Sequence, residues 1–326
     1  MLRFALHFPG GGMRRSGLLL VVLAAMLWGT DSLFRRPLTR SLSPVTIVFL
    51  EHLVLVLVML PFLFRSALVL RNLGRRDWVA LAFIALGGSV AATSLFTFAI
   101  KHGNPSVAAL LQKTQPIFTL LLAGWILGER PGRWFWFCFP PAVGGAYLVA
   151  APDWRAAFAF NLQQPEAALA AMGAAALWGS STVFGRYVVA RVPALVLTGL
   201  RFAISLPMLA LLYVIQPQLD RSLPASIDAT FSIVAMALIP GLLALIFYYQ
   251  GLRSTSASLA SIGELAFPIT AVTANWYLLG SRLTVSQILG ACILVAAVTL
   301  LTFLGSTNSA PPRARSEGST PGECTA

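Results

Sequence analysis

The chain has 326 residues, of which 57% are hydrophobic and only 10% are charged, and its formal net charge at pH 7 is +12. Together with a mean hydropathy of +0.80, this composition excludes an ordinary soluble domain and predicts a membrane protein. Most of the positive charge comes from Arg residues at the ends of apolar segments rather than from one basic face, so nucleic acid is not an expected partner.

Apolar stretches of roughly 20 residues recur along the chain, and each is long enough as a helix to cross a hydrocarbon core of about 30 Å. They lie near residues 16–34, 45–64, 78–100, 105–127, 133–151, 167–189, 193–215, 229–252, 256–279 and 283–304. The predicted fold class is therefore an all-α integral membrane protein with ten transmembrane helices. No motif for a cofactor or a metal is found, and no phosphate-binding loop of the form GxxxxGK[ST] occurs.

The two halves of the chain repeat each other. Residues 25–36, AMLWGTDSLFRR, return as AALWGSSTVFGR at 175–186, and the segment that starts at Phe96 returns from Tyr248. Because each copy holds five predicted spans, an odd number, the second copy must enter the membrane from the opposite side. The repeats are therefore predicted to be inverted, which is an architecture of alternating-access transporters.

The predicted organisation follows from these repeats. It comprises a cytoplasmic N-terminal segment (1–15), a first five-span repeat (16–151), an inter-repeat loop (152–166), a second five-span repeat (167–304) and a disordered cytoplasmic tail (305–326). With both termini in the cytoplasm, the cytoplasmic segments hold about twice as many Arg and Lys residues as the outside segments, which supports this orientation. Arg35, Arg36 and Arg40 are assigned to an outside segment.

Three motifs carry a resemblance to a known family. They are AxLWG in the first span of each half, the turn Lys101–Gly103 leading into Ser106–Ala109, and LGER at 127–130. In these motifs the chain resembles the EamA-type drug/metabolite transporter superfamily, and within it the bacterial exporters of aromatic and other amino acids. The resemblance implies ten helices in two inverted repeats, export as the direction of transport, and the bacterial inner membrane as the location. One departure is His52, which stands where the second repeat has the more usual Arg201.

Six ionisable side chains fall inside the predicted spans, where a charge costs at least a few kcal/mol unless it faces a cavity or a partner. They are Asp31, Glu51, His52, Lys113, Arg201 and Glu264. Asp31, Glu51 and Glu264 are candidates for proton or charge coupling. Structural ion pairs between helices are the alternative for Glu51 and Arg201. His52 is a candidate substrate-binding residue, and because it can titrate near neutral pH, a proton-linked role is the alternative for it.

Pro116 and Pro268 stand at equivalent positions in the two repeats. Proline cannot donate to the carbonyl four residues back, so both helices are predicted to kink and to leave the carbonyls of Gln112 and Glu264 free. A polar side chain beside a free carbonyl in both repeats favours a substrate site formed by Gln112, Lys113 and Glu264. The alternative is a kink that only shapes helix packing.

Four aromatic residues complete the predicted substrate site. Trp28 and Trp178 are repeat equivalents that each precede a glycine, and Phe96 and Tyr248 form a second equivalent pair. We expect them to line the central cavity, with plain helix packing as the alternative. Trp134, at the start of the fifth span, is instead expected in the interfacial belt.

The sequence therefore predicts a secondary transporter, not an enzyme, that exports small metabolites by alternating access around a midplane cavity. The expected substrates are amino acids with aromatic or other apolar side chains, because Glu264 can accept from an ammonium group while Lys113 or Gln112 binds the carboxylate. The expected partners are the substrate and the lipid bilayer, with proton coupling, in a monomer or a weak dimer. The alternatives are a transporter of a nucleoside, a sugar or a drug-like cation, a passive channel, and an integral-membrane enzyme that modifies lipids.

Overall fold

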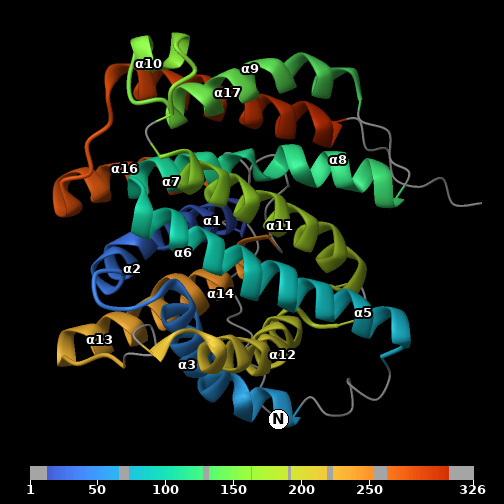
Figure 1. The fold of residues 1–326 in the computed structure, drawn as a ribbon. Coiled ribbons are helices and arrows are strands. Elements are labelled where there is room, and N and C mark those ends of the chain that lie inside the picture. The colour runs from blue at the N-terminus through green and yellow to red at the C-terminus, as the bar shows by residue number, and fades with distance from the viewer. Residues whose placement is uncertain are drawn as a thin grey trace, which may run out of the picture.

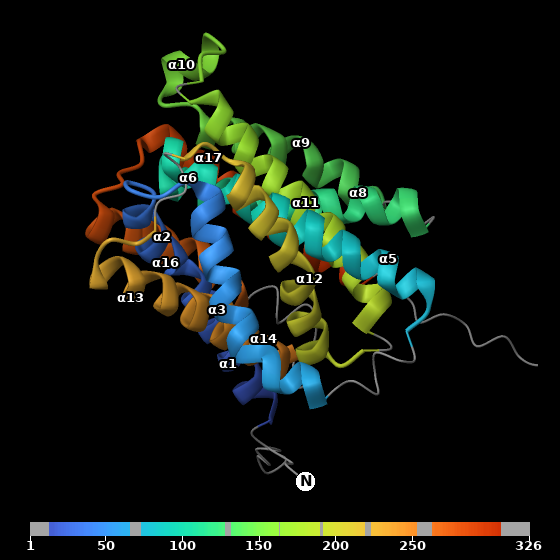
Figure 2. The same ribbon diagram turned by 60° about the horizontal axis from the view of Figure 1, so that its bottom comes forward.

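The computed structural model describes residues 13–65, 73–127, 132–162, 164–189, 192–218, 223–252 and 263–307, and these ranges contain helices and turns without a strand. The expectations for residues 1–12, for most of the LGER motif and for the tail beyond Thr307 lie outside the described residues. Figures 1 and 2 show the helices gathered in one bundle, with α9 (Arg133–Ala150) and α17 (Val285–Thr307) side by side at one edge.

The remaining helices follow the predicted spans in order. The first half holds α1 (Met13–Gly29), α2 (Asp31–Leu38), α3 (Pro44–Arg65), α5 (Arg75–Phe83), the π-helix η1 (Ile84–Ala91), α6 (Ala92–His102), α7 (Pro105–Leu111), the 3-10 helix η2 (Gln112–Thr114) and α8 (Gln115–Leu127). The second half holds α11 (Pro165–Val189), α12 (Ala194–Ile215), α13 (Ile227–Met236), the π-helix η4 (Ala237–Leu243), α14 (Ala244–Leu252) and α16 (Ala266–Leu279). Between the halves lies the short helix α10 (Trp154–Phe158).

Among the described residues, seven helical segments are long and apolar enough to cross a membrane. They are Gly17–Leu38, Pro44–Phe64, Arg75–His102, Pro165–Gly185, Leu195–Ile215, Ile227–Tyr248 and Val285–Leu304. The protein is thus a multi-pass membrane protein, as its composition predicts. The other predicted spans coincide with the interrupted helix α7–η2–α8 and with the shorter helices α9 and α16.

The first span is longer than predicted. Only Thr30 separates α1 from α2, so that the apolar segment continues to Leu38 and includes Arg35. The side chain of Arg35 is only 3% exposed, whereas a residue of an outside segment would be expected to face water. Two carboxylates that bond to it explain why an arginine can be buried here.

Helices of one half pack against helices of the other half, and equivalent helices make equivalent contacts. In the first half α1 contacts α14 and α16, and in the second half α11 contacts the equivalent α6 and α8. The equivalent helices α3 and α12 contact each other, as do α9 and α17. The halves are consequently interlocked rather than side by side.

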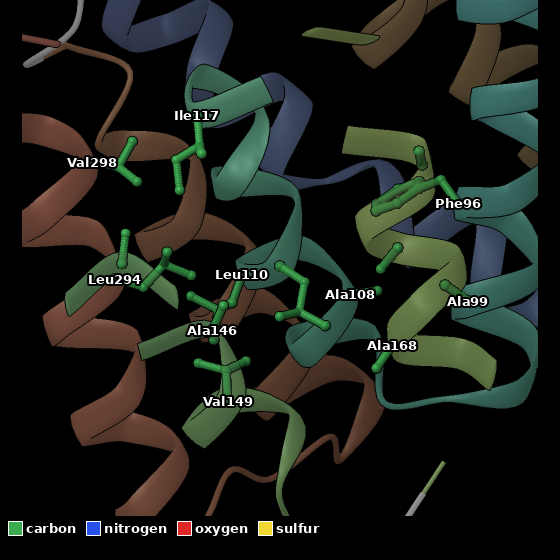
Figure 3. Packing of buried hydrophobic residues seen from close by; sticks show 14 of the residues in the cluster. Phe96, Ala99, Ala108, Leu110, Ile117, Ala146, Val149, Ala168, Leu294 and Val298 are labelled. Atoms are coloured by element: carbon green, nitrogen blue, oxygen red, sulfur yellow. The ribbon is translucent and has the colours of Figure 1, made fainter. Parts of the chain in front are cut away.

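Small residues allow this close approach. A Cβ added at Gly145 of α9 would lie 2.8 Å from the carbonyl oxygen of Gly290, and one added at Gly290 of α17 would lie 2.9 Å from that of Gly145. Figure 3 shows Ala146 and Val149 of α9 packed with Leu294 of α17 in the largest core cluster. Because lipid tails are as apolar as these side chains, such close packing, rather than burial from water, holds membrane helices together.

Two π-helical segments occupy matching positions. Under the alignment that pairs Phe96 with Tyr248, η1 and η4 precede the equivalent helices α6 and α14. Pro240 within η4 cannot donate a backbone hydrogen bond, which explains the local change of pattern there. In η1 the matching position is Gly88. Segments of this kind are often found at functional sites.

Candidate functional site

The helices that carry Pro116 and Pro268 are both interrupted just before the proline. In the first half, the 3-10 turn η2 separates α7 from α8. In the second half, a turn at Glu264 and Leu265 precedes α16. The two interruptions occupy equivalent positions in the repeats.

The backbone carbonyls at these interruptions are not free, contrary to the expectation. The N–H group of Gln115 donates to the carbonyl of Gln112, and the N–H group of Phe267 donates to that of Glu264 at 3.1 Å. The backbone here forms 3-10 hydrogen bonds, between residues three apart, in place of the bond that proline cannot make. Any binding by Gln112 and Glu264 therefore has to come mainly from their side chains.

Two aromatic pairs join the halves. The rings of Trp28 and Tyr248 have centroids 5.0 Å apart and are tilted by 54°, and those of Trp178 and Phe96 have centroids 5.3 Å apart and are tilted by 59°. Because Trp28 is equivalent to Trp178 and Tyr248 to Phe96, this is one contact made twice. Phe96 is buried, whereas the other three side chains are half-buried and leave aromatic surface available. The tilted geometry is typical of favourable ring contacts.

The first pair belongs to a group that we call the Glu264 cluster: Trp28, Lys113, Tyr248, Glu264 and Phe267. The hydroxyl group of Tyr248 donates to Oε1 of Glu264 at 2.6 Å. The ammonium group of Lys113 lies 4.6 Å from the ring centroid of Phe267, whose backbone N–H group donates to the carbonyl of Glu264. Trp28 packs in the same small hydrophobic cluster as Phe267. The structure thus brings together four residues predicted from distant parts of the sequence.

The second pair lies beside η1. The indole N–H group of Trp178 donates to the carbonyl of Gly88 at 2.8 Å. A Cβ at Gly88 would collide with Oγ of Ser181 and would lie 3.3 Å from Nη2 of Arg201, so a larger residue would displace these side chains. The guanidinium group of Arg201 also donates through Nε to Oγ of Ser89 at 2.9 Å. A cation is therefore held next to this pair, as Lys113 is held next to the first.

His52 and Gln112, two further predicted binding residues, lie in different places. His52 is 2% exposed, with Nδ1 2.8 Å from the carbonyl oxygen of Val48 and the ring edge-on to Phe202 at 5.1 Å. These contacts hold it between α3 and α12 rather than in the Glu264 cluster. Gln112 is half-buried on η2, next to Lys113.

Asp31 and Glu51 meet at a residue that the sequence did not single out. The guanidinium group of Arg35 donates to both oxygens of Asp31 at 2.7 and 2.8 Å and to both oxygens of Glu51 at 3.1 and 3.2 Å. Its remaining N–H donates to Oγ1 of Thr97 at 3.0 Å. We call Asp31, Arg35, Glu51 and Thr97 the Arg35 network. Thr97 follows Phe96 directly on α6, so the network adjoins the second aromatic pair.

The described part of the structure also has a hollow of about 330 Å³ between α5 and α11. Apolar side chains line most of it, with two arginines among them: Arg75, Arg76, Val79, Ala80, Val183, Phe184 and Tyr187. None of the binding residues predicted from the sequence belongs to this lining.

Comparison with known proteins decides the family. The model of the EamA-like transporter family matches the chain twice, over residues 15–151 and 166–303. The chain belongs to the EamA-like transporter family. Two separate matches of similar length also agree with the internal repeat.

Its relatives extend over nearly the whole chain. This EamA-like transporter is 30% identical over 295 residues to the riboflavin transporter ImpX of Fusobacterium nucleatum, which covers 88% of this chain and 98% of that protein. It is 25% identical over 318 residues to the uncharacterized inner membrane transporter YicL of Salmonella typhimurium, covering 90% and 97% of the two chains. One protein of known crystal structure shares the fold with a TM-score of 0.62 at 20% identity, covering 91% of this chain and 100% of that one.

The comparisons support part of what the sequence predicts. Membership of the family and transport of small metabolites are confirmed. Neither relative reported above carries the name of an amino-acid exporter, so that resemblance within the superfamily stays a prediction. Arg35 could have been found from its spacing, because Asp31 lies one helical turn before it.

Proposed function

We propose that the protein is a secondary transporter of the bacterial inner membrane that carries small aromatic metabolites by alternating access between two inverted repeats. The observation that carries this proposal is the matched set of aromatic pairs, Trp28 with Tyr248 and Trp178 with Phe96, each formed across the two halves. A substrate held at both pairs touches both repeats, so a rearrangement of one repeat against the other changes the side from which it is reached.

The proposed inverted arrangement is supported by the matching contacts of equivalent helices: α1 packs against α14 and α16, and α11 packs against α6 and α8. Seven described segments qualify as spans by length and composition, and α7–η2–α8, α9 and α16 are proposed as the three further ones. Ten spans divide into five per repeat, and an odd number per repeat reverses the second copy. Both termini are proposed to be cytoplasmic, with export as the direction of net flux, in a monomer or a weak dimer.

Flavins are the leading candidate substrates. The relative that matches over 98% of its length is named as a riboflavin transporter, and two aromatic pairs provide surfaces suited to a planar heteroaromatic ring. Lys113 and Glu264 bring opposite charges into one cluster, so the charges partly balance each other. A neutral substrate that needs stacking and a few hydrogen bonds suits such a site.

Aromatic amino acids are the second candidate. Glu264 offers an acceptor for an ammonium group, and Lys113 on the neighbouring interrupted helix offers a donor for a carboxylate. A zwitterion that inserted between them would exchange their mutual attraction for two charge-assisted hydrogen bonds. The same aromatic pairs would then bind its side chain.

Counterflow in proteoliposomes tests the proposal. Purified protein is reconstituted into vesicles loaded with unlabelled riboflavin or phenylalanine, and uptake of the same labelled compound is followed. Saturable uptake above that of protein-free vesicles, which requires the unlabelled compound inside, supports a carrier and identifies the better substrate. Uptake that ignores the internal compound and does not saturate would indicate a channel, and uptake of neither compound would refute transport of small aromatic metabolites.

A further inference from the structure

The Arg35 network is saturated with hydrogen bonds. A guanidinium group has five N–H donors, and in Arg35 each of them meets an oxygen of Asp31, Glu51 or Thr97. The side chain of Arg35 is 3% exposed, that of Glu51 8% and that of Asp31 18%. The network joins α2, α3 and α6, which belong to three of the segments that are long and apolar enough to cross a membrane.

The charges in this network do not balance. Two carboxylates surround one guanidinium group, so the network carries one excess negative charge when both acids are ionised. Keeping an uncompensated charge away from water costs several kcal/mol, and a buried acid avoids that cost by taking up a proton. One carboxylate of the network is consequently expected to be protonated for part of the transport cycle.

The distances indicate which carboxylate this is. The two bonds from Arg35 to Asp31 measure 2.7 and 2.8 Å, within the range of charge-assisted hydrogen bonds, whereas those to Glu51 measure 3.1 and 3.2 Å. Asp31 also lies one helical turn before Arg35 on α2. Asp31 thus forms the stronger ion pair with Arg35. Glu51 can therefore be protonated while Arg35 keeps an ion pair.

The other charged or titratable groups on the surrounding helices have different contacts. Arg36 of α2 donates to the carbonyls of Ile100 and Lys101 at the end of α6, and the Nδ1 atom of His52 on α3 faces the carbonyl of Val48. Elsewhere on the helices around the network, Lys101 and His102 end α6, Arg201 of α12 donates to Ser89, and Asp228 is exposed at the start of α13. The described ion pairs of Asp31 and Glu51 are those with Arg35.

We propose that the Arg35 network is the proton-binding site of this transporter and that Glu51 carries the proton.

Helix α6 links this proton-binding site to the substrate. The hydroxyl group of Thr97 accepts from Arg35 and donates to the carbonyl of Thr93, and the preceding residue, Phe96, contacts Trp178. Ionisation of Glu51 strengthens its hold on Arg35 and thereby changes the position of α6. This coupling step rests on the proposed function, whereas proton binding itself does not.

Infrared spectroscopy tests proton binding without any substrate. We expect the wild-type protein in lipid to show a carbonyl stretch of a protonated carboxyl group that is lost on alkalinisation, shifts when glutamate is labelled with ¹³C at its carboxyl carbon, and is missing in Glu51→Gln. Glu166→Gln, at an exposed carboxylate of α11, should keep the band. If Glu51→Gln does not fold, Glu51→Asp should move the band from the glutamate label to the aspartate label. No titrating band, or a band unchanged in the Glu51 variants, would overturn the proposal.

Counterflow and accumulation test the coupling. Glu51→Gln should retain riboflavin counterflow, which needs no net proton movement, and should lose accumulation driven by a pH gradient down to the level of protein-free vesicles. Retained accumulation in Glu51→Gln would refute the coupling. Absence of counterflow in the wild type would refute the proposed substrate instead and would leave the infrared result to decide the proton site.

Discussion

Replacing Gly179 by Ala should separate two helices that cross at the interface between the repeats. A Cβ at Gly179 of α11 would lie 2.9 Å from the carbonyl oxygen of Gln115 and 3.0 Å from the backbone nitrogen of Thr119, both on α8. Carbon contacts of this kind normally begin at about 3.5 Å. Because backbone atoms cannot rotate away, the helices must move apart by roughly half an ångström. Overpacking by one methyl group costs about 1–3 kcal/mol in the free energy of unfolding.

The matched control lies on the same helix. A Cβ at Gly185 would meet no atom within 4 Å, so Gly185→Ala should leave the protein unchanged apart from a small gain in helix propensity. Gly29→Ala is the equivalent change in the first repeat, where the Cβ would lie 3.0 Å from the carbonyl oxygen of Phe267. The unfolding temperature in detergent and the rate of riboflavin counterflow should both be lower in Gly179→Ala and Gly29→Ala than in the wild type. Equal results for Gly179→Ala and Gly185→Ala would refute the crossing geometry.

Two single contacts and the orientation in the membrane can each be tested by substitution. Arg35→Met leaves the buried Glu51 and the half-buried Asp31 without their cation, so the free energy of unfolding should fall by about 3–5 kcal/mol, and an unchanged unfolding temperature would contradict the network. Tyr248→Phe removes the hydroxyl group that orients Glu264, and flux should fall by about tenfold with unchanged monodispersity; full activity would exclude a role for this bond. Single cysteines at Arg155 and Arg76, both exposed, should react with impermeant reagents from outside and from the cytoplasm respectively, and the reverse labelling would invert the orientation.

Local features of the sequence account for what could be predicted. The spans follow from apolar length, and the repeats follow from residues such as Trp28 and Trp178 that recur in the same surroundings. Pro116 and Pro268 indicate where the two helices are interrupted, because the missing N–H group has a fixed position. The missing N–H group of proline shows which hydrogen bond is lost but not which bond replaces it. The 3-10 bonds to the carbonyls of Gln112 and Glu264 could therefore not be predicted.

Contacts between distant residues set the limit of prediction. Asp31 and Arg35 are four residues apart, and their pairing is readable from helical spacing. Glu51 and Thr97 reach Arg35 over separations of 16 and 62 residues, which depend on how three helices pack. For the same reason Arg35 was predicted to lie outside the first span. The sequence near Arg35 does not show that Glu51 bonds to it.

The proposed transport mechanism depends on contact between the substrate and the two tryptophans. Trp28→Ala and Trp178→Ala each remove a ring contact worth about 0.5–1.5 kcal/mol in addition to buried area. Trp134→Ala is the control, because Trp134 lies at the start of α9 beside Arg133. Inhibition of counterflow by riboflavin, phenylalanine and threonine should be compared in the four proteins. We predict that Trp28→Ala and Trp178→Ala lose inhibition by the aromatic compounds more than by threonine, while Trp134→Ala keeps the wild-type order. An identical order of inhibitors in all four proteins would show that the tryptophans only pack helices and that the substrate binds elsewhere.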